Sequence, residues 1–241
     1  MERMRRRILA LAGLASAGVA LPGLSRAAGP RDGARLKIGI VGSGRVGGTL
    51  GAIWAKAGHR VMLSSRDIEH DRALAARIGP NASAGTPREA AAFGEVVVVS
   101  VPYGALPEVG KALADVIRDK VVIDTCNPFE GRDGEIALWA REKGAGLASA
   151  ELLAGARVVR AFNAIGHVRM GEAHERPGQA GMPIAGDDAR AVDLAARLVR
   201  DIGFEPVLVG GLAMGRHLMP GTPLAGERTP DEIRRIAATL R

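Results

Sequence analysis

The sequence contains few of the residues that crosslink a chain, stack on nucleobases or span a membrane. Cys126 is the single cysteine among 241 residues, which excludes an internal disulfide framework. Aromatic residues amount to 3%, few for a protein that stacks bases on aromatic rings. The apolar run from Ile8 to Leu21 has 14 residues, fewer than the roughly 20 of a membrane-spanning helix. With 47% hydrophobic residues, the chain is expected to fold around an Ala- and Val-rich core.

The first 28 residues differ from the rest of the chain. The basic stretch MERMRRR precedes the apolar run, and PGLSRAA follows it, which is the order of a secretory signal peptide. The sequence RRRIL at residues 5–9 also resembles the twin-arginine export pattern. We therefore expect residues 1–28 to be a cleaved export leader and the mature protein to be periplasmic or secreted. Membrane contact is then limited to the leader before cleavage; an uncleaved membrane span is the alternative.

The charges and histidines predict neither a nucleic-acid partner nor a metal. The formal net charge of +7 is concentrated in the leader, where five arginines face Glu2, so the rest of the chain carries only about +3. His167 and His174 are seven residues apart with Glu172 between them, which is not a spacing typical of metal ligands. We interpret both histidines as solvated loop residues.

Apolar runs and helical patterns alternate from residue 36 onward. Patterns that predict strands lie at 36–41, 60–65, 81–85, 95–102, 120–128, 156–165, 183–186 and 205–211. Patterns that predict helices lie at 45–58, 69–78, 86–93, 106–117, 148–155, 187–203 and 230–241. The alternation is typical of an α/β fold with a doubly wound parallel (Rossmann) sheet. We expect one domain over 35–213, a short helical C-terminal segment over 214–241, and a long irregular connection over 168–182 of the kind that covers sites.

Gly42, Gly44 and Gly47 follow the first predicted strand and open a helix. In this context the first glycine permits a tight turn, the second lets a pyrophosphate approach the backbone, and the third allows close packing of helix on strand. The helix N-terminus then faces the phosphates. The pattern predicts a dinucleotide site. The alternative is that these three, among 33 glycines, merely interrupt regular structure.

The end of the second predicted strand indicates which dinucleotide binds. An NAD site usually has Asp or Glu here to accept hydrogen bonds from the ribose hydroxyls, whereas this chain has Ser64, Ser65 and Arg66. Hydroxyls and a guanidinium are donors, and the planar arginine fork fits a phosphate. We therefore predict NADP as the cofactor. In the alternative, Asp67 turns inward and Arg66 is solvated beside it.

Six segments, in this order and spacing, resemble a known family. They are IGIVGSGRVGGTLGAIWAKAGH, VMLSSR, VVVSVP, VIDTCNP, ARVVRAFNAI and RDIGFEPVLVGGL. Together they resemble the NADP-oxidoreductase family that includes the deazaflavin-dependent NADP reductases. They are also similar to the NADPH-binding domain of the STEAP metalloreductases. The resemblance spans roughly residues 36–213.

The resemblance implies roles for particular residues. Ser43, Gly44, Arg45 and Val46 would wrap the pyrophosphate, and the 2′-phosphate would lie on the SSR segment, at Ser65 and Arg66. The nicotinamide and its ribose would lie near Ser100, Val101, Pro102, Asn127, Pro128, Phe162 and Asn163. A flavin or deazaflavin would stack there as the planar second redox partner.

Hydride transfer between a nicotinamide and a flavin-type ring depends on stacking and distance more than on a protein acid or base. The sequence offers no convincing catalytic constellation, which fits an NADP-dependent oxidoreductase of this type. Two alternatives stay open: a sensor or carrier of NADP(H) without turnover, and a small-molecule reductase completed at a homodimer interface by residues 211–241. Cys126 is expected to be a buried, unreactive thiol and Trp54 a core residue.

Overall fold

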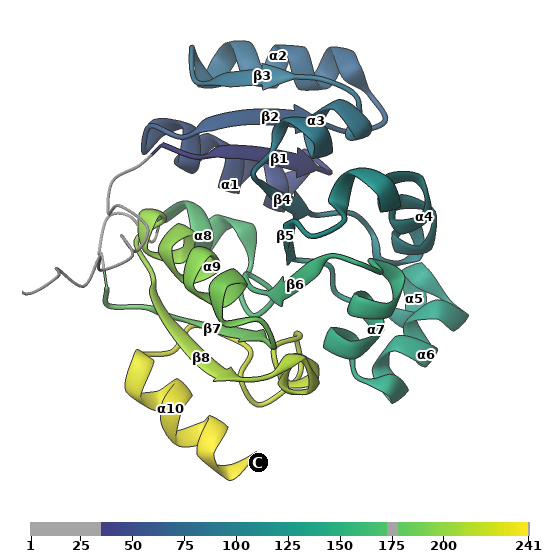
Figure 1. Ribbon diagram of the computed structural model, residues 1–241. Helices are drawn as coiled ribbons and strands as arrows, with labels where there is room; N and C mark the ends of the chain where they lie inside the picture. Colours follow the sequence, from purple (N-terminus) through teal and green to yellow (C-terminus); the bar gives the residue numbers. More distant parts are fainter. Residues whose placement is uncertain (1–34, 173–177, 241) are drawn as a thin grey trace, which may run out of the picture. The chain divides into compact units, whose positions relative to one another are not determined.

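The computed structural model describes residues 35–172 and 178–240, within which eight strands form one sheet in the order β3-β2-β1-β4-β5-β6-β7-β8 (Figure 1). The strands are β1 (Lys37–Val41), β2 (Arg60–Ser64), β3 (Ala82–Ala84), β4 (Val96–Val99), β5 (Val121–Asp124), β6 (Arg157–Arg160), β7 (Gly181–Gly186) and β8 (Glu205–Gly210). The helices are α1 (Arg45–Lys56), α2 (Ile68–Ile78), α3 (Pro87–Phe93), α4 (Leu106–Ile117), α5 (Glu130–Asp133), α6 (Glu135–Lys143), α7 (Ala145–Leu152), α8 (His167–Glu172), α9 (Ala189–Asp201) and α10 (Pro230–Thr239). Two short 3-10 helices, η1 (Tyr103–Ala105) and η3 (Leu212–His217), complete the elements.

The sheet is a doubly wound Rossmann sheet, as predicted. Strands β1 to β6 are parallel, and the chain order reverses between β1 and β4, so the crevice for a ligand is expected at their carboxyl ends. The last two strands differ from the expectation of a parallel sheet, because β7 is antiparallel to β6 and β8 is parallel to β7. The reason is the short α8 after β6: it packs on α1 instead of crossing the length of the sheet, so the chain re-enters from the carboxyl end.

Three helices were not expected from the sequence. Helices α5 and α6 occupy the stretch between Pro128 and α7, which corresponds to the helix predicted over 148–155. Helix α8 begins at His167, one residue before the connection predicted to be irregular over 168–182, and occupies its first five residues. In α6 the buried residues are the small Ala137 and Ala140. Two alanines give only a weak hydrophobic periodicity, so the sequence does not indicate a helix here.

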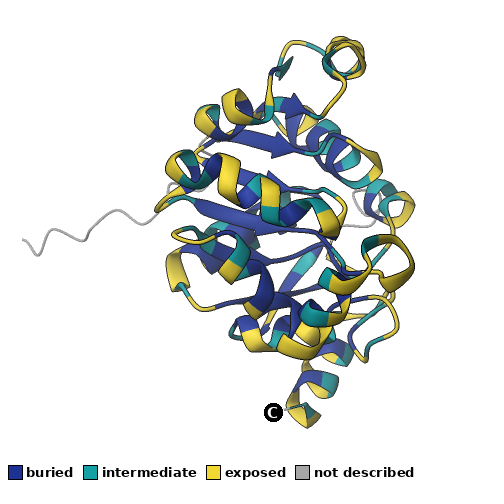
Figure 2. Cartoon of the chain, turned by 90° about the vertical axis from the view of Figure 1, so that its right-hand side faces the viewer, coloured by how far each residue is buried: buried dark blue, intermediate teal, exposed yellow. Residues whose placement is uncertain are grey.

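Alternate residues of the central strands feed two separate cores. Val96 and Val98 pack on the side of α1 and α9, whereas Val97 and Val99 pack on the side of α4 and α7. Figure 2 shows the buried strands lying between helices whose outer faces are exposed. The continuous apolar run VVVV is therefore buried on both faces, as the period of 2 requires for a central parallel strand.

The C-terminal segment packs on its own sheet. Ile233 and Ala237 of α10 are buried in a third cluster with Val207 of β8 and with Leu218 and Leu224 of the preceding loop. In a reductase completed by exchange of residues 211–241 between subunits, these contacts would form between subunits instead of within one chain.

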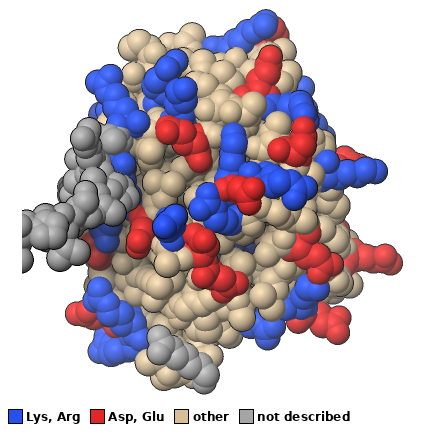
Figure 3. All heavy atoms as spheres, in the orientation of Figure 1, with Lys and Arg blue, Asp and Glu red and all other residues tan. Residues whose placement is uncertain are grey.

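Within residues 35–172 and 178–240, no helix combines the length and apolarity needed to cross a membrane. The predicted export leader, residues 1–28, lies outside the described residues. Lys and Arg side chains alternate with Asp and Glu on the face shown in Figure 3, and neither sign dominates it.

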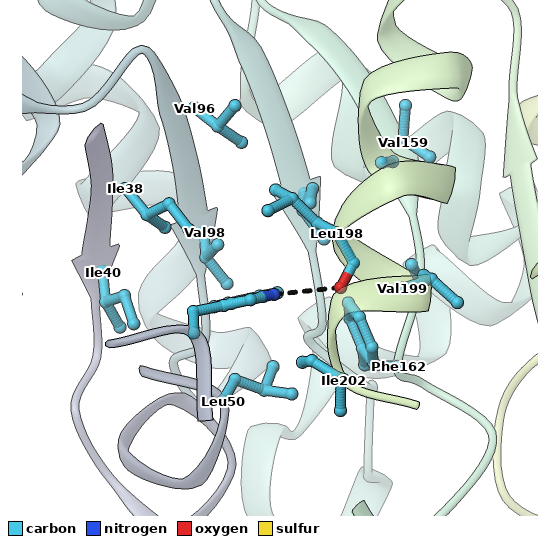
Figure 4. Packing of buried hydrophobic residues seen from close by; sticks show 14 of the residues in the cluster. Ile38, Ile40, Leu50, Val96, Val98, Val159, Phe162, Leu198, Val199 and Ile202 are labelled. Carbon is cyan, nitrogen blue, oxygen red and sulfur yellow. Dashed lines mark hydrogen bonds between the residues drawn. The ribbon is translucent and has the colours of Figure 1, made fainter. Parts of the chain in front are cut away.

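Trp54 of α1 ties this helix to α9. Its indole Nε1 donates to Leu198 O at 2.9 Å, and this carbonyl lies in the last turn of α9, where intrahelical partners are lacking. The dashed line in Figure 4 ends at that oxygen. The ring also meets Phe162 edge to face, with centroids 5.7 Å apart. The prediction of Trp54 as a core residue is confirmed, since it is fully buried.

We predict that Trp54→Phe lowers the free energy of unfolding by about 2 kcal/mol, because it leaves the Leu198 carbonyl without its donor and opens a cavity beside Phe162. Urea denaturation followed by circular dichroism measures the change. The matched control is Trp139→Phe on α6, where the ring is only partly buried and the expected loss is below about 1 kcal/mol. Equal losses for both variants would contradict the role assigned to this bond.

Candidate functional site

The three glycines after β1 differ in what surrounds them. Gly42 has φ +104°, and a Cβ there would lie 2.2 Å from Ser100 O, so this turn requires glycine. A Cβ on Gly47 would lie 2.1 Å from Gly42 O, which accounts for the close packing of α1 on β1. A Cβ on Gly44 would meet no atom within 4 Å. Packing of the chain explains two of the glycines, and the open space beside Gly44 is what a phosphate needs to approach the backbone.

Hydrogen-bond donors remain at the N-terminus of α1. The first N–H groups of a helix have no intrahelical partner, and no side chain caps α1, whose first turn has no acidic residue. The N–H groups of Gly42 and Ser43 are already used, because both donate to Ser64 O at 2.9 Å. The donors available to an anion therefore start beside Gly44, where the helix dipole adds partial positive charge.

Ser64 does not face this space. Its side chain is fully buried, and its Oγ donates to Ile40 O at 2.7 Å on the neighbouring strand β1. This corrects the expectation that the Ser64 hydroxyl binds a 2′-phosphate. Successive side chains of a strand point to opposite faces of the sheet, and the side chain of Ser64 points to a face that is covered by packing.

Arg66 lies between two residues that are held in place. Ser65 Oγ accepts from Asp67 N at 3.1 Å and donates to Asp71 Oδ2 at 2.9 Å. Asp67 caps α2, since its Oδ1 accepts from His70 N at 3.0 Å. Asp67 therefore does not turn inward toward the cofactor, which was the alternative left open by the sequence. Arg66 is exposed and has no ion pair within the described residues.

The loops after β4, β5 and β6 meet at the same edge of the sheet, because these strands are parallel neighbours. Asn127 Nδ2 donates to Asn163 O at 2.9 Å, and Asn163 Nδ2 donates to Cys126 O at 3.4 Å. Asn163 Oδ1 is buried without a hydrogen-bond partner in the described part of the chain. Of the other predicted residues here, Ser100 and Val101 are partly buried, Pro102 is exposed and Pro128 is buried. The edge thus offers one unpaired acceptor to a ligand.

Phe162 contributes its backbone to this edge and its ring to the core. Its φ of +66° turns the chain at the end of β6, a conformation that costs a non-glycine residue on the order of 1 kcal/mol. Its side chain is buried against Trp54. The expectation that Phe162 lines the nicotinamide side is therefore not met by its ring, because a large aromatic ring gains more from burial in the core.

A buried ion pair behind the same edge was missed in the sequence. Arg160 of β6 and Asp124 of β5 are both fully buried, with Nη1 2.5 Å from Oδ2. Arg160 Nη2 donates to Cys126 O at 3.0 Å and to Asn127 Oδ1 at 3.2 Å, and Asp124 Oδ1 accepts from Cys126 N at 2.8 Å. The pair therefore fixes the loop that carries Asn127. The signal was a charged residue at the carboxyl end of each of two neighbouring strands, Asp124 in VVID and Arg160 in RVVR.

Burial also determines the state of the thiol in this loop. The pKa of Cys126 is raised well above its ordinary value by burial and further by the nearby Asp124 carboxylate, so the thiol stays protonated. This agrees with the predicted buried, unreactive cysteine. Across the described residues, no three His, Cys, Asp or Glu side chains are grouped to hold a metal ion. His174 lies outside those residues.

A cleft of about 580 Å³ opens beside α8, with Phe204 at its apolar side and Arg169 and Glu227 among its charged residues. Arg169 forms ion pairs with Glu172 and Glu227, so much of the charge in the wall is already neutralised. The described lining includes none of the residues predicted to bind the cofactor. A polyanionic dinucleotide is therefore better matched to the N-terminus of α1 than to this cleft.

We predict that Arg160→Met lowers the free energy of unfolding by about 4 kcal/mol, because it leaves Asp124 buried and unpaired. The double variant Asp124→Leu/Arg160→Met should recover at least about half of that loss, since no charge is then left in the core. The control Arg88→Met removes the exposed ion pair with Asp115 and should cost less than about 1 kcal/mol. Chemical denaturation measures all three. A double variant as unstable as the single one would contradict the argument from unpaired charge.

Comparison with known proteins places these features in a family. Residues 37–128 match the family model described as NADP oxidoreductase, coenzyme F420-dependent. The F420-dependent NADP reductase of Methanothermobacter thermautotrophicus is 32% identical over 205 residues, which cover 78% of this chain and 87% of that protein. The metalloreductase STEAP3 of Rattus norvegicus is 30% identical over 185 residues, which cover 76% of this chain but 35% of that protein.

Solved structures show the same fold. A hypothetical protein from Sinorhizobium meliloti superposes with a TM-score of 0.68 at 22% identity, covering 81% of this chain and 96% of that one. A structure described as a putative F420-dependent NADP reductase from Arthrobacter sp. FB24 gives 0.62 at 21% identity, covering 75% and 87%. At these identities the likeness shows the fold alone.

Proposed function

This chain belongs to the family of coenzyme F420-dependent NADP oxidoreductases, and from that premise we propose that it transfers a hydride between NADP(H) and a flavin- or deazaflavin-type partner. Family membership makes it an NADP-dependent oxidoreductase with a Rossmann fold. The planar partner is the part proposed here. It is supported by the relatives' use of coenzyme F420. It is also supported by the chemistry of the sheet edge formed by the loops after β4, β5 and β6, which we call the nicotinamide edge.

Gly44 is the observation that carries the cofactor assignment. The packing of the chain does not require a glycine there, and the space beside it adjoins the free donors of α1. Gly44, Arg45 and Val46 would hold the pyrophosphate at these donors. Ser43 would act less directly, because its N–H is already bonded to Ser64 O. Arg66, exposed and unpaired within the described residues, would hold the 2′-phosphate.

The nicotinamide edge favours transfer between two redox rings over reduction of a carbonyl. When bound, NADPH supplies the hydride. Two titratable side chains near Asn127 are withdrawn from solvent: Asp124 is fully buried and paired with Arg160, and burial raises the pKa of Tyr103 above its ordinary value. The exposed Arg132 donates to Asn127 O at 2.8 Å. The residues that remain, Asn127 and Asn163, are suited to orienting a ring, and the unpaired Asn163 Oδ1 fits a carboxamide donor. Among the described residues of this edge, neither Asn127 nor Asn163 carries a group that exchanges a proton with a substrate hydroxyl.

We predict that the purified protein binds NADPH at least about tenfold more tightly than NADH, because Arg66 pairs with the 2′-phosphate. Arg66→Asp should abolish that preference, whereas Arg77→Asp, the same charge change at the exposed far end of α2, should keep it. Titration by nicotinamide fluorescence measures both. A preference that survives Arg66→Asp would refute the 2′-phosphate assignment.

The redox partner is tested on the same samples. Addition of flavin or of coenzyme F420 to the NADPH complex should cause loss of absorbance at the nicotinamide band. Tight binding of NADPH without oxidation by either acceptor would favour a sensor or carrier of NADP(H). Failure to bind any dinucleotide would reject both proposals.

We further propose that residues 1–28 export the protein to the periplasm by the twin-arginine route. Replacement of Arg5, Arg6 and Arg7 by Lys keeps the charge and removes the arginine pair, so we expect it to abolish export. Arg3→Lys is the matched control. Cell fractionation and immunoblotting measure the location, and unchanged export of the triple variant would reject this route.

A further inference from the structure

One carboxylate next to the proposed cofactor site is buried without the partners that such a charge usually has. Asp71 is fully buried, although it belongs to the surface helix α2, whose neighbouring charged residues Glu69 and Arg72 are exposed and pair with each other. Within the described residues its one ion-pair partner is His70, with Nδ1 at 3.4 Å, and that ring is half exposed. A buried carboxylate is costly unless hydrogen bonds compensate it.

Two serine hydroxyls supply those hydrogen bonds, one to each oxygen. Ser43 Oγ donates to Asp71 Oδ1, and Ser65 Oγ donates to Asp71 Oδ2 at 2.9 Å. Ser43 belongs to the glycine loop before α1, and Ser65 belongs to the loop after β2. Asp71 therefore joins, through a third element, the two loops assigned to the pyrophosphate and to the 2′-phosphate.

These bonds leave Ser65 without a proton for a phosphate. A serine hydroxyl has one proton, and that of Ser65 is shared between Asp71 Oδ2 and the more distant Asp67 O at 3.2 Å. The Ser65 oxygen meanwhile accepts from Asp67 N. Ser65 thus serves the geometry of the turn, and the donor left for a 2′-phosphate is Arg66.

Both neighbours of Arg66 are fixed by α2. Ser65 is held by Asp71 in the first turns of the helix, and Asp67 is the N-cap that accepts from His70 N at 3.0 Å. The backbone of Arg66, and with it the direction in which its exposed side chain points, is consequently determined by Ser65 and Asp67. Because Asp71 has both oxygens occupied and no exposed surface, it is not itself a partner for a ribose hydroxyl.

We propose that Asp71 is a positioning residue for 2′-phosphate selectivity, which acts by holding Ser65 and thereby the turn from which Arg66 meets the phosphate. The proposal rests on the NADP assignment made above. It adds a specificity determinant that lies outside the cofactor-binding surface and that touches no cofactor.

The test compares NADPH and NADH binding. Asp71→Asn keeps the shape of the side chain but weakens both acceptor contacts, so we expect the Kd for NADPH to rise about tenfold while that for NADH changes less than about twofold. Glu69→Gln, an exposed carboxylate on the same helix, is the control and should change neither. Ser65→Ala should reduce the preference for NADPH in the same way, and it serves if Asp71→Asn fails to fold in a thermal unfolding assay.

A double-variant cycle separates positioning from a merely structural role. In the Arg66→Ala background, Asp71→Asn should have little further effect on NADPH binding, because the group that it positions is absent. Independent, additive losses, or equal weakening of NADPH and NADH by Asp71→Asn, would overturn the positioning role. The 2′-phosphate assignment is judged separately by Arg66→Ala alone: if that variant keeps the wild-type preference, the assignment of the 2′-phosphate to Arg66 fails, whatever Asp71 does, whereas the proposed function fails only if no dinucleotide binds.

Discussion

The close approach of α1 to the sheet is the constraint on which the rest of the structure depends. Gly47 and Gly51 of this helix face the sheet, and a Cβ on either would lie within 2.7 Å of Gly42 O or of the Ile40 side chain. The helix can therefore lie directly on β1, which brings its N-terminus to the carboxyl end of the strand. Trp54, three residues further on along the same face of the helix, then reaches α9 through its bond to Leu198 O.

Buried polar groups hold the two ends of the cofactor edge in different ways. At the adenine end, Asp71 links two loops through hydroxyls; at the nicotinamide end, Arg160 and Asp124 link the loop after β5 to β6. Such groups contribute little net stability, because removing charges from water costs about as much as their pairing returns. Their effect is on geometry: a loop with its polar partners inside the fold has few alternative positions. Both ends of the edge are thereby shaped before a cofactor arrives.

The order of elements and the class of cofactor were predictable because they depend on local patterns. A few consecutive residues are enough to recognise a buried strand such as VVVV, the capped helix after Thr86 or the glycine loop. The assignment of Arg66 to a 2′-phosphate stays a prediction, which rests on the absence of an acid after β2 in the sequence. By contrast, Ser64 was misjudged: it has the same chemistry as Ser65, but its side chain points into the sheet, where its Oγ donates to Ile40 O.

The sequence by itself determined the Rossmann fold, the position of the glycine loop and the preference for a 2′-phosphate, because hydrophobic period, glycine conformation and side-chain charge act over short stretches of chain. Only the tertiary structure decided which hydroxyls are free, where the Phe162 ring lies and what the buried charges hold. Those outcomes depend on residues distant in sequence, such as Ser43 and Asp71, 28 positions apart, and Trp54 and Leu198, 144 apart. A hydrogen bond over such a separation leaves no pattern in the sequence, since its geometry exists only once the sheet has brought its loops to one edge.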